Sequence, residues 1–203
     1  MKAAGPLSLG RFVLRIFLWL PPCFAVWYLG AQHLARLFGA LAGLLVDLFK
    51  PALVSAVERQ GPDLVFVTTI VVHPAPTQTG VLLMEVDPML YTYGLPFFVA
   101  LMLAARAKGW KVLAGAVVLL PFQAWGIAFD FLAQVVRTGA DVSAQAGLSG
   151  WRSEGVALAY QAGSLLFPVL VPVALWVAFN RPLFDGLVRA PSREIRPPAG
   201  TVR

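Results

Sequence analysis

Polar side chains recur at regular intervals within an apolar stretch at residues 110–136. Gln123, Asp130 and Gln134 are spaced by seven and four residues, so they share one face of a helix. Arg137 extends that face three residues further on. A carboxylate inside a membrane-spanning helix is costly and normally faces other helices, water or a basic partner. Asp130 is therefore a candidate for intramembrane chemistry or permeation, or for a network that only fixes helix packing.

A second polar group, formed by Tyr160, Gln161 and Ser164, lies near the outer end of a later apolar stretch at residues 156–180. These side chains could pack against the face that carries Asp130, which would bring the two helices together. The residues of these two helices that we predict to bind a partner are Gln123, Asp130, Gln134, Tyr160 and Gln161.

The chain has one cysteine, Cys23, which follows two prolines in the first apolar stretch. A nucleophilic cysteine needs a neighbouring base. His33 is ten residues further on, which is about 15 Å along a continuous helix. Lipid attachment would need small residues just before the cysteine, where the chain has Leu20, Pro21 and Pro22. We predict that Cys23 only fills space, and we predict no catalytic residue, cofactor or metal site.

The elements that carry these residues follow from composition. Hydrophobic residues make up 59% of the 203 residues and charged residues 13%, which is typical of an integral membrane protein. A spanning helix needs about 20 mostly apolar residues. The sequence predicts one all-α membrane domain over residues 1–203, with four transmembrane helices at about residues 11–31, 89–105, 110–136 and 156–180. The basic residues lie beside these segments, so they indicate contact with the lipid bilayer and not with nucleic acid.

A shorter apolar stretch at about residues 33–49 carries Arg36 and Asp47. It is predicted to be an interfacial or re-entrant helix, although a further span is the alternative. Gly39 and Gly43 form a small-residue ridge that would allow another helix to approach closely. We therefore include both glycines among the predicted partner-binding residues.

Residues 63–87 contain β-branched runs separated by a turn-rich segment, HPAPTQTG. This pattern predicts a β-hairpin outside the bilayer, on the periplasmic side. Residues 181–203 are rich in proline and arginine and are predicted to form a cytoplasmic tail, disordered beyond Val188.

The distribution of basic residues predicts the orientation. With four spans and the amino terminus inside, eleven Lys and Arg residues fall on inner segments and five on outer segments. The positive-inside rule then places both termini in the cytoplasm. If residues 33–49 also crossed the membrane, this asymmetry would reverse.

Four ordered stretches, FLWLPPCFAVWYL, DPMLYTYGLPFFVALMLA, LLPFQAWGIAFDF and ALAYQAGSLLFPVLVPVALWVAFNR, resemble those of the exosortase H-associated membrane proteins. The resemblance covers roughly residues 11–181. It implies a small protein of the bacterial inner membrane, linked to exosortase H, an enzyme that processes secreted proteins bearing a C-terminal sorting signal.

Exosortases present a cysteine, an arginine and a histidine or second arginine at the outer face of the membrane. This sequence departs from that pattern, because Cys23 lies beside prolines in the first span and no histidine follows His73. The resemblance therefore implies a non-catalytic accessory protein that docks on exosortase H or on its sorting-signal substrates. The alternative is an intramembrane enzyme or a small permeation protein built around Asp130.

Overall fold

The computed structural model describes residues 9–75 and 78–188. In chain order, the elements are α1 (Leu9–Phe49), β1 (Val54–Gln60), β2 (Asp63–Ala75), β3 (Gln78–Val86), α2 (Met89–Thr92), α3 (Gly94–Ala104), α4 (Gly109–Thr138), α5 (Ala140–Gln145), α6 (Trp151–Gln161), the π-helix η1 (Ala162–Leu166), α7 (Phe167–Phe179) and α8 (Arg181–Val188).

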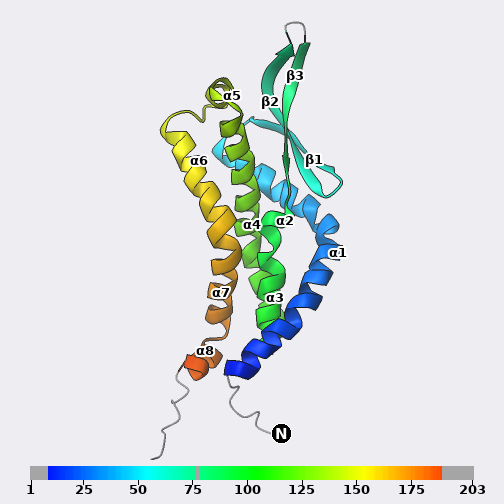
Figure 1. Ribbon diagram of the computed structural model, residues 1–203, viewed down its shortest axis with the longest axis vertical. Helices are drawn as coiled ribbons and strands as arrows, with labels where there is room; N and C mark the ends of the chain where they lie inside the picture. The colour runs from blue at the N-terminus through cyan, green and yellow to red at the C-terminus, as the bar shows by residue number, and fades with distance from the viewer. Residues whose placement is uncertain (1–8, 76–77, 189–203) are drawn as a thin grey trace, which may run out of the picture.

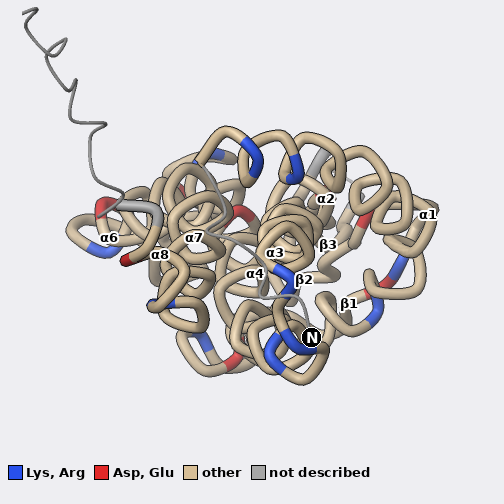
Figure 2. Tube along the Cα trace, turned by 90° about the horizontal axis from the view of Figure 1, so that it is seen from below, with Lys and Arg blue, Asp and Glu red and all other residues tan. Residues whose placement is uncertain are grey.

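The molecule is elongated, with the sheet at one end and both ends of the described chain at the other (Figure 1). α1 and α4 run toward the sheet, whereas α3 and the rod formed by α6, η1 and α7 run back. Seen along the long axis, α3 and α4 lie between α1 on one side and α7 on the other (Figure 2). The helices therefore form an antiparallel bundle.

Three helical segments are long and apolar enough to cross a membrane: Leu9–Phe49, Gly109–Thr138 and Trp151–Phe179. Met89–Ala104 is apolar but shorter. At 1.5 Å per residue it reaches about 24 Å, less than the roughly 30 Å of a bilayer core. The prediction of a membrane protein with apolar helices is confirmed, and the fourth span stays a prediction.

The two segments predicted at 11–31 and 33–49 are one helix, α1, so their separation was wrong. No proline or turn sequence interrupts the chain near Gln32, while Pro21 and Pro22 lie earlier and are accommodated within the helix. α1 bends along its course, and its second half crosses the bundle beneath the sheet (Figure 1). The segment predicted to be interfacial or re-entrant is this second half, and its position relative to the membrane stays a prediction.

The predicted β-hairpin is part of a three-stranded antiparallel sheet in the order β1-β2-β3, so the all-α class needs correction. Pairs such as Val57 with Phe66 and Phe66 with Met84 set the register. β1 was not predicted, because its sequence, VSAVERQ, lacks a regular apolar alternation. In the structure the strand is largely exposed. Open sheet edges do not occur in contact with lipid tails. We therefore expect the sheet to lie outside the hydrocarbon core, which stays a prediction.

Two apolar clusters hold the bundle together. Beneath the sheet, Phe66 of β2 stacks on Phe131 of α4 with ring centroids 4.5 Å apart, which fixes the sheet on the helices. At the opposite end, Phe12 of α1 stacks on Trp176 of α7 at 5.1 Å, beside the buried Phe98 of α3. Each cluster joins elements distant in sequence, so aromatic packing holds the elements together at both ends of the bundle.

The predicted tail begins with a helix, since α8 covers Arg181–Val188. Residues 189–203 and residues 1–8, on which several basic residues of the orientation prediction fall, lie outside the described residues.

Candidate functional site

Asp130 lies at the sheet end of α4, and its side chain is 11% exposed. Gln134, one turn later, donates from Nε2 to Asp130 Oδ2 at 3.2 Å and to the Glu85 carbonyl of β3 at 3.0 Å. Arg137 Nη2 lies 3.6 Å from Asp130 Oδ1. The helix face predicted from the spacing therefore forms a connected network, and Gln134 ties it to the sheet.

Two tyrosines from other helices complete this network. The Arg137 guanidinium lies over the Tyr160 ring of α6, 5.4 Å from its centroid. Tyr91 of α2 is 3% exposed, and its side chain lies near those of Asp130 and Tyr160. We call these five residues, Tyr91, Asp130, Gln134, Arg137 and Tyr160, the Asp130 cluster.

Close backbone contact between α4 and η1 positions Tyr160. A methyl group added at Gly163 would lie 2.8 Å from the Cα of Gly126, and one added at Gly126 would lie 2.5 Å from Tyr91 Cδ1. Only glycine permits both approaches. The π-helix η1, which begins at Ala162, lies at this contact. Single π-helical turns within α-helices occur frequently at functional sites.

Sequence reasoning missed Tyr91, which lies in a short helix directly after the sheet. The available signal was the pair Asp87 and Pro88, since Asp87 Oδ1 accepts a hydrogen bond from the Met89 backbone N–H at 2.8 Å and starts α2. That turn directs Tyr91 toward α4. An aromatic residue near a predicted membrane boundary is more readily interpreted as an interfacial anchor.

Gln123 and Gln161 lie outside the Asp130 cluster. Gln123 is buried on α4 and donates from Nε2 to the Thr92 carbonyl at 3.3 Å, so it ties α4 to α2. Gln161 is exposed at the end of α6, and the structure does not bring it to Asp130. The predicted polar set is thus divided between a cluster, a separate interhelical contact and a surface position.

The small-residue ridge of α1 faces the protein's own sheet. A methyl group at Gly39 would lie 2.9 Å from Leu64 Cδ2, and one at Gly43 would lie 3.1 Å from Val57 Cγ2. Both glycines let β1 and β2 pack closely on α1. Binding of another protein through this ridge stays a prediction.

The Asp130 cluster joins α4, α6 and β3 through one ion pair, hydrogen bonds and a cation–π contact, with Tyr91 of α2 beside it. These contacts compensate the cost of a buried carboxylate. Within residues 9–75 and 78–188, no group of three or more His, Cys, Asp or Glu side chains is arranged to hold a metal ion. The arrangement fixes the position of the sheet on the helices.

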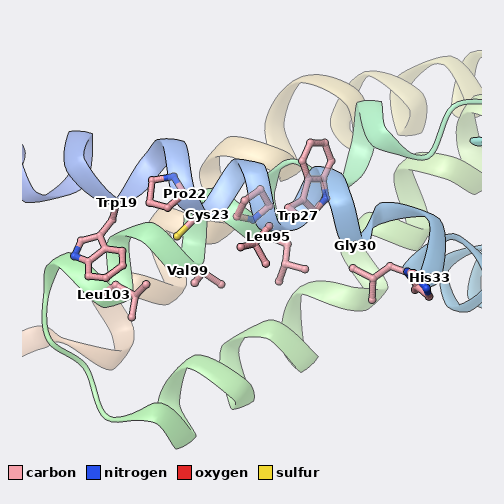
Figure 3. A pocket seen from close by; sticks show the side chains of 12 residues that line it. Trp19, Pro22, Cys23, Trp27, Gly30, His33, Leu95, Val99 and Leu103 are labelled. Atoms are coloured by element: carbon pink, nitrogen blue, oxygen red, sulfur yellow. The ribbon is translucent and has the colours of Figure 1, made fainter.

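A groove of about 650 Å³ runs between α1 and α3 and is lined almost wholly by apolar side chains. We call it the α1–α3 groove. Its α1 wall includes Trp19, Pro22, Cys23 and Trp27, and its α3 wall includes Val99 and Leu103. The Cys23 sulfur lies on the α1 wall and is directed toward α3 near Val99 (Figure 3). Cys23 therefore lines an open groove and does not fill a closed core.

A bundle of apolar helices with a small sheet fixed at one end defines a helical membrane protein. A family model described as exosortase H-associated membrane protein matches residues 6–183, so the chain belongs to that family. The resemblance drawn from the four sequence stretches is confirmed. No curated protein and no solved structure matches the chain.

Proposed function

We propose that the protein is a non-catalytic accessory subunit that docks on exosortase H in the membrane. The α1–α3 groove is the observation that carries this proposal. It is an apolar hollow between the first helix and the shorter apolar helix, in a protein whose family is described as exosortase H-associated. The proposed occupant is a transmembrane helix of exosortase H.

The dimensions and composition of the groove support a helix as occupant. Its α1 wall extends from Trp19 to Leu34, which is about 22 Å of helix at 1.5 Å per residue. Pro22, Cys23 and Gly30 are small or compact residues on that wall. Helices in membranes associate mainly through close van der Waals packing at such small residues.

In this proposal, the Asp130 cluster orders the sheet end and does no chemistry. Its carboxylate is already engaged by Arg137 and Gln134, and Gln134 also bonds the sheet. The sheet has two edge strands, β1 and β3. An edge strand can accept an extended segment by strand addition, which would suit a sorting-signal substrate presented to exosortase H.

We also propose that the protein lies in the bacterial inner membrane with four spans, both termini in the cytoplasm and the sheet in the periplasm. In support, the start of α1 and the short helix α8 lie at the same end of the bundle (Figure 1). Arg11, Lys108 and Arg181 belong to segments at that end as well. Reporter fusions at the carboxyl terminus and at the β2–β3 turn test this orientation.

Filling the groove tests the docking proposal. Leu103→Trp adds bulk on the α3 wall, and Leu113→Trp makes the same change at a position on α4 that is 69% exposed. We expect Leu103→Trp to reduce copurification of exosortase H by at least tenfold and to slow maturation of sorting-signal proteins. Leu113→Trp should behave as wild type. Equal copurification with both variants would contradict docking at this groove.

Asp130→Asn separates this proposal from an enzyme built on the carboxylate. The amide retains an oxygen that can accept from Gln134 but carries no charge. An accessory role predicts that maturation of sorting-signal proteins continues. Loss of maturation at normal abundance and normal copurification would instead favour catalysis by Asp130.

A further inference from the structure

Two cations from distant parts of the chain converge on one backbone oxygen near the sheet end. Lys50, which follows α1, places Nζ 3.4 Å from the Gly147 carbonyl oxygen, and Arg152 of α6 places Nη1 3.1 Å from the same atom. The two cationic groups are therefore closer together than the sum of those distances. Among the described residues, one ion pair forms, between Arg137 and Asp130. Within that part of the chain, neither Lys50 nor Arg152 has a carboxylate partner.

The loop geometry at Gly147 permits this convergence. Gly147 has φ +62°, a left-handed conformation that favours glycine. A methyl group added there would lie 2.7 Å from Lys50 Nζ. The loop thus holds the two positive charges of Lys50 and Arg152 beside each other. Like charges repel each other, and an anion between them would offset that repulsion.

An apolar slot opens beside the two cations. It has a volume of about 540 Å³ and lies between the end of α1, α4 and α6. Its walls include Phe49, Trp125, Phe129 and Val156, while Lys50 and Arg152 are also among its lining residues. The Trp125 indole N–H is already donated to the Ala159 carbonyl at 3.1 Å, so its ring presents an apolar surface to the slot.

Nearby residues place the cations at membrane-interface depth. Trp151 lies next to Arg152 and is 79% exposed, and the Arg152 guanidinium lies 5.7 Å from its ring centroid. Exposed tryptophan beside arginine is typical of the lipid headgroup level. A ligand that spans both parts of the site needs a negative group at that level and a hydrocarbon chain below it.

We propose that Lys50 and Arg152 bind the phosphate of an anionic phospholipid whose acyl chain occupies the slot. Charge-assisted hydrogen bonds from both cations would hold the phosphate. The bound phosphate would also relieve the repulsion between the two cations. This site is separate from the α1–α3 groove and does not depend on docking to exosortase H.

Native mass spectrometry of the full chain in detergent, titrated with phosphatidylglycerol, tests this site. We expect wild type to retain one phosphatidylglycerol molecule, and Lys50→Gln with Arg152→Gln to bind it at least tenfold more weakly. Arg106→Gln with Lys108→Gln removes the same charge at the other end of the bundle and should leave binding unchanged. Equal weakening by both pairs, or by neither, would overturn the proposal.

A second variant addresses the slot without touching the cations. Gly155 lines the slot, and nothing lies within 4 Å of a methyl group added there, so the backbone at this position tolerates a side chain. Gly155→Phe is designed to place a ring at the slot. It should also weaken phosphatidylglycerol binding by at least tenfold. Unchanged binding by Gly155→Phe, or competition by inorganic phosphate as effective as by the lipid, would show a simple anion site and overturn the phospholipid assignment.

Discussion

The Asp130 cluster and the Lys50–Arg152 pair both lie toward the sheet end, but their charges are balanced differently. Asp130 is buried and meets one cation, Arg137, together with hydrogen-bond donors. Lys50 and Arg152 share a neutral carbonyl and have no anion between them among the described residues. Because a compensated charge is satisfied by the fold itself, we expect the first site to serve stability. We expect the second to have binding capacity left for a ligand, as proposed above.

This difference predicts opposite responses to mutation. Changes in the Asp130 cluster should lower stability with or without lipid, since they break contacts between elements. Changes in the Lys50–Arg152 pair should alter the response to phospholipid and leave the lipid-free protein nearly unaffected. The predictions below run from the largest expected effect on stability to the smallest.

Gly163→Ala should have the largest effect. The added methyl group meets the backbone of Gly126, which cannot move aside as a flexible side chain can. Overpacking of this kind costs about 1–3 kcal/mol, and it would push Tyr160 away from Arg137. Thermal unfolding in detergent measures the loss. Gly155→Ala on α6 is the matched control, because it meets no atom within 4 Å, and should be neutral or slightly stabilising. Equal stability of the two variants would contradict the close approach.

Asp130→Ala should destabilise the protein by about 1–3 kcal/mol, because it removes one acceptor of Gln134 and the ionic partner of Arg137, both charge-assisted contacts of a largely buried carboxylate. Asp130→Asn keeps an acceptor oxygen and should lose less. Unfolding of both variants in the same detergent gives the comparison. An equal loss for the two variants would indicate that the ion pair, and not the acceptor oxygen, dominates the cluster.

Arg137→Gln should have a smaller effect, within about 0.2–1 kcal/mol for an ion pair at the surface. The Arg137 side chain is 58% exposed, so water and salt screen its attraction to Asp130. Its cation–π contact with Tyr160 adds a similar small amount. The destabilisation should shrink as salt concentration rises. An unchanged difference at high salt would show that packing, and not charge, accounts for it.

Lys50→Gln should have the smallest effect in the absence of phospholipid, within about 0.5 kcal/mol. It removes one of two neighbouring cations, so the lost hydrogen bond to Gly147 is offset by weaker repulsion. Adding phosphatidylglycerol should then stabilise wild type more than this variant. A large loss of stability without lipid would mean that Lys50 belongs to the folded core and would remove the contrast between the two sites.

Helical periodicity accounts for what the sequence predicted at the Asp130 cluster. Asp130, Gln134 and Arg137 recur on one face of a single long helix, and Tyr160 lies on the helix expected to meet that face. Gln161 was included because it adjoins Tyr160 in sequence. Adjacent residues on a helix point about 100° apart, and Gln161 is exposed where Tyr160 is partly buried.

Features formed between distant segments were not accessible from local patterns. Lys50 and Gly147 are 97 positions apart, so their contact depends on how α1 bends beneath the sheet. β1 gave no apolar alternation because it lies at the sheet edge with few buried side chains. The continuity of α1 also differed from expectation, since flanking charge and length indicated two separate segments where the chain remains helical.

Docking of exosortase H at the α1–α3 groove is the central claim, and in-cell photo-cross-linking tests it most directly. A photoreactive amino acid at Leu103 should cross-link to exosortase H, whereas the same amino acid at Leu113, which is exposed outside the groove, should not. Cross-links to exosortase H from Leu113 but not from Leu103, or from neither when both proteins are present, would contradict the claim.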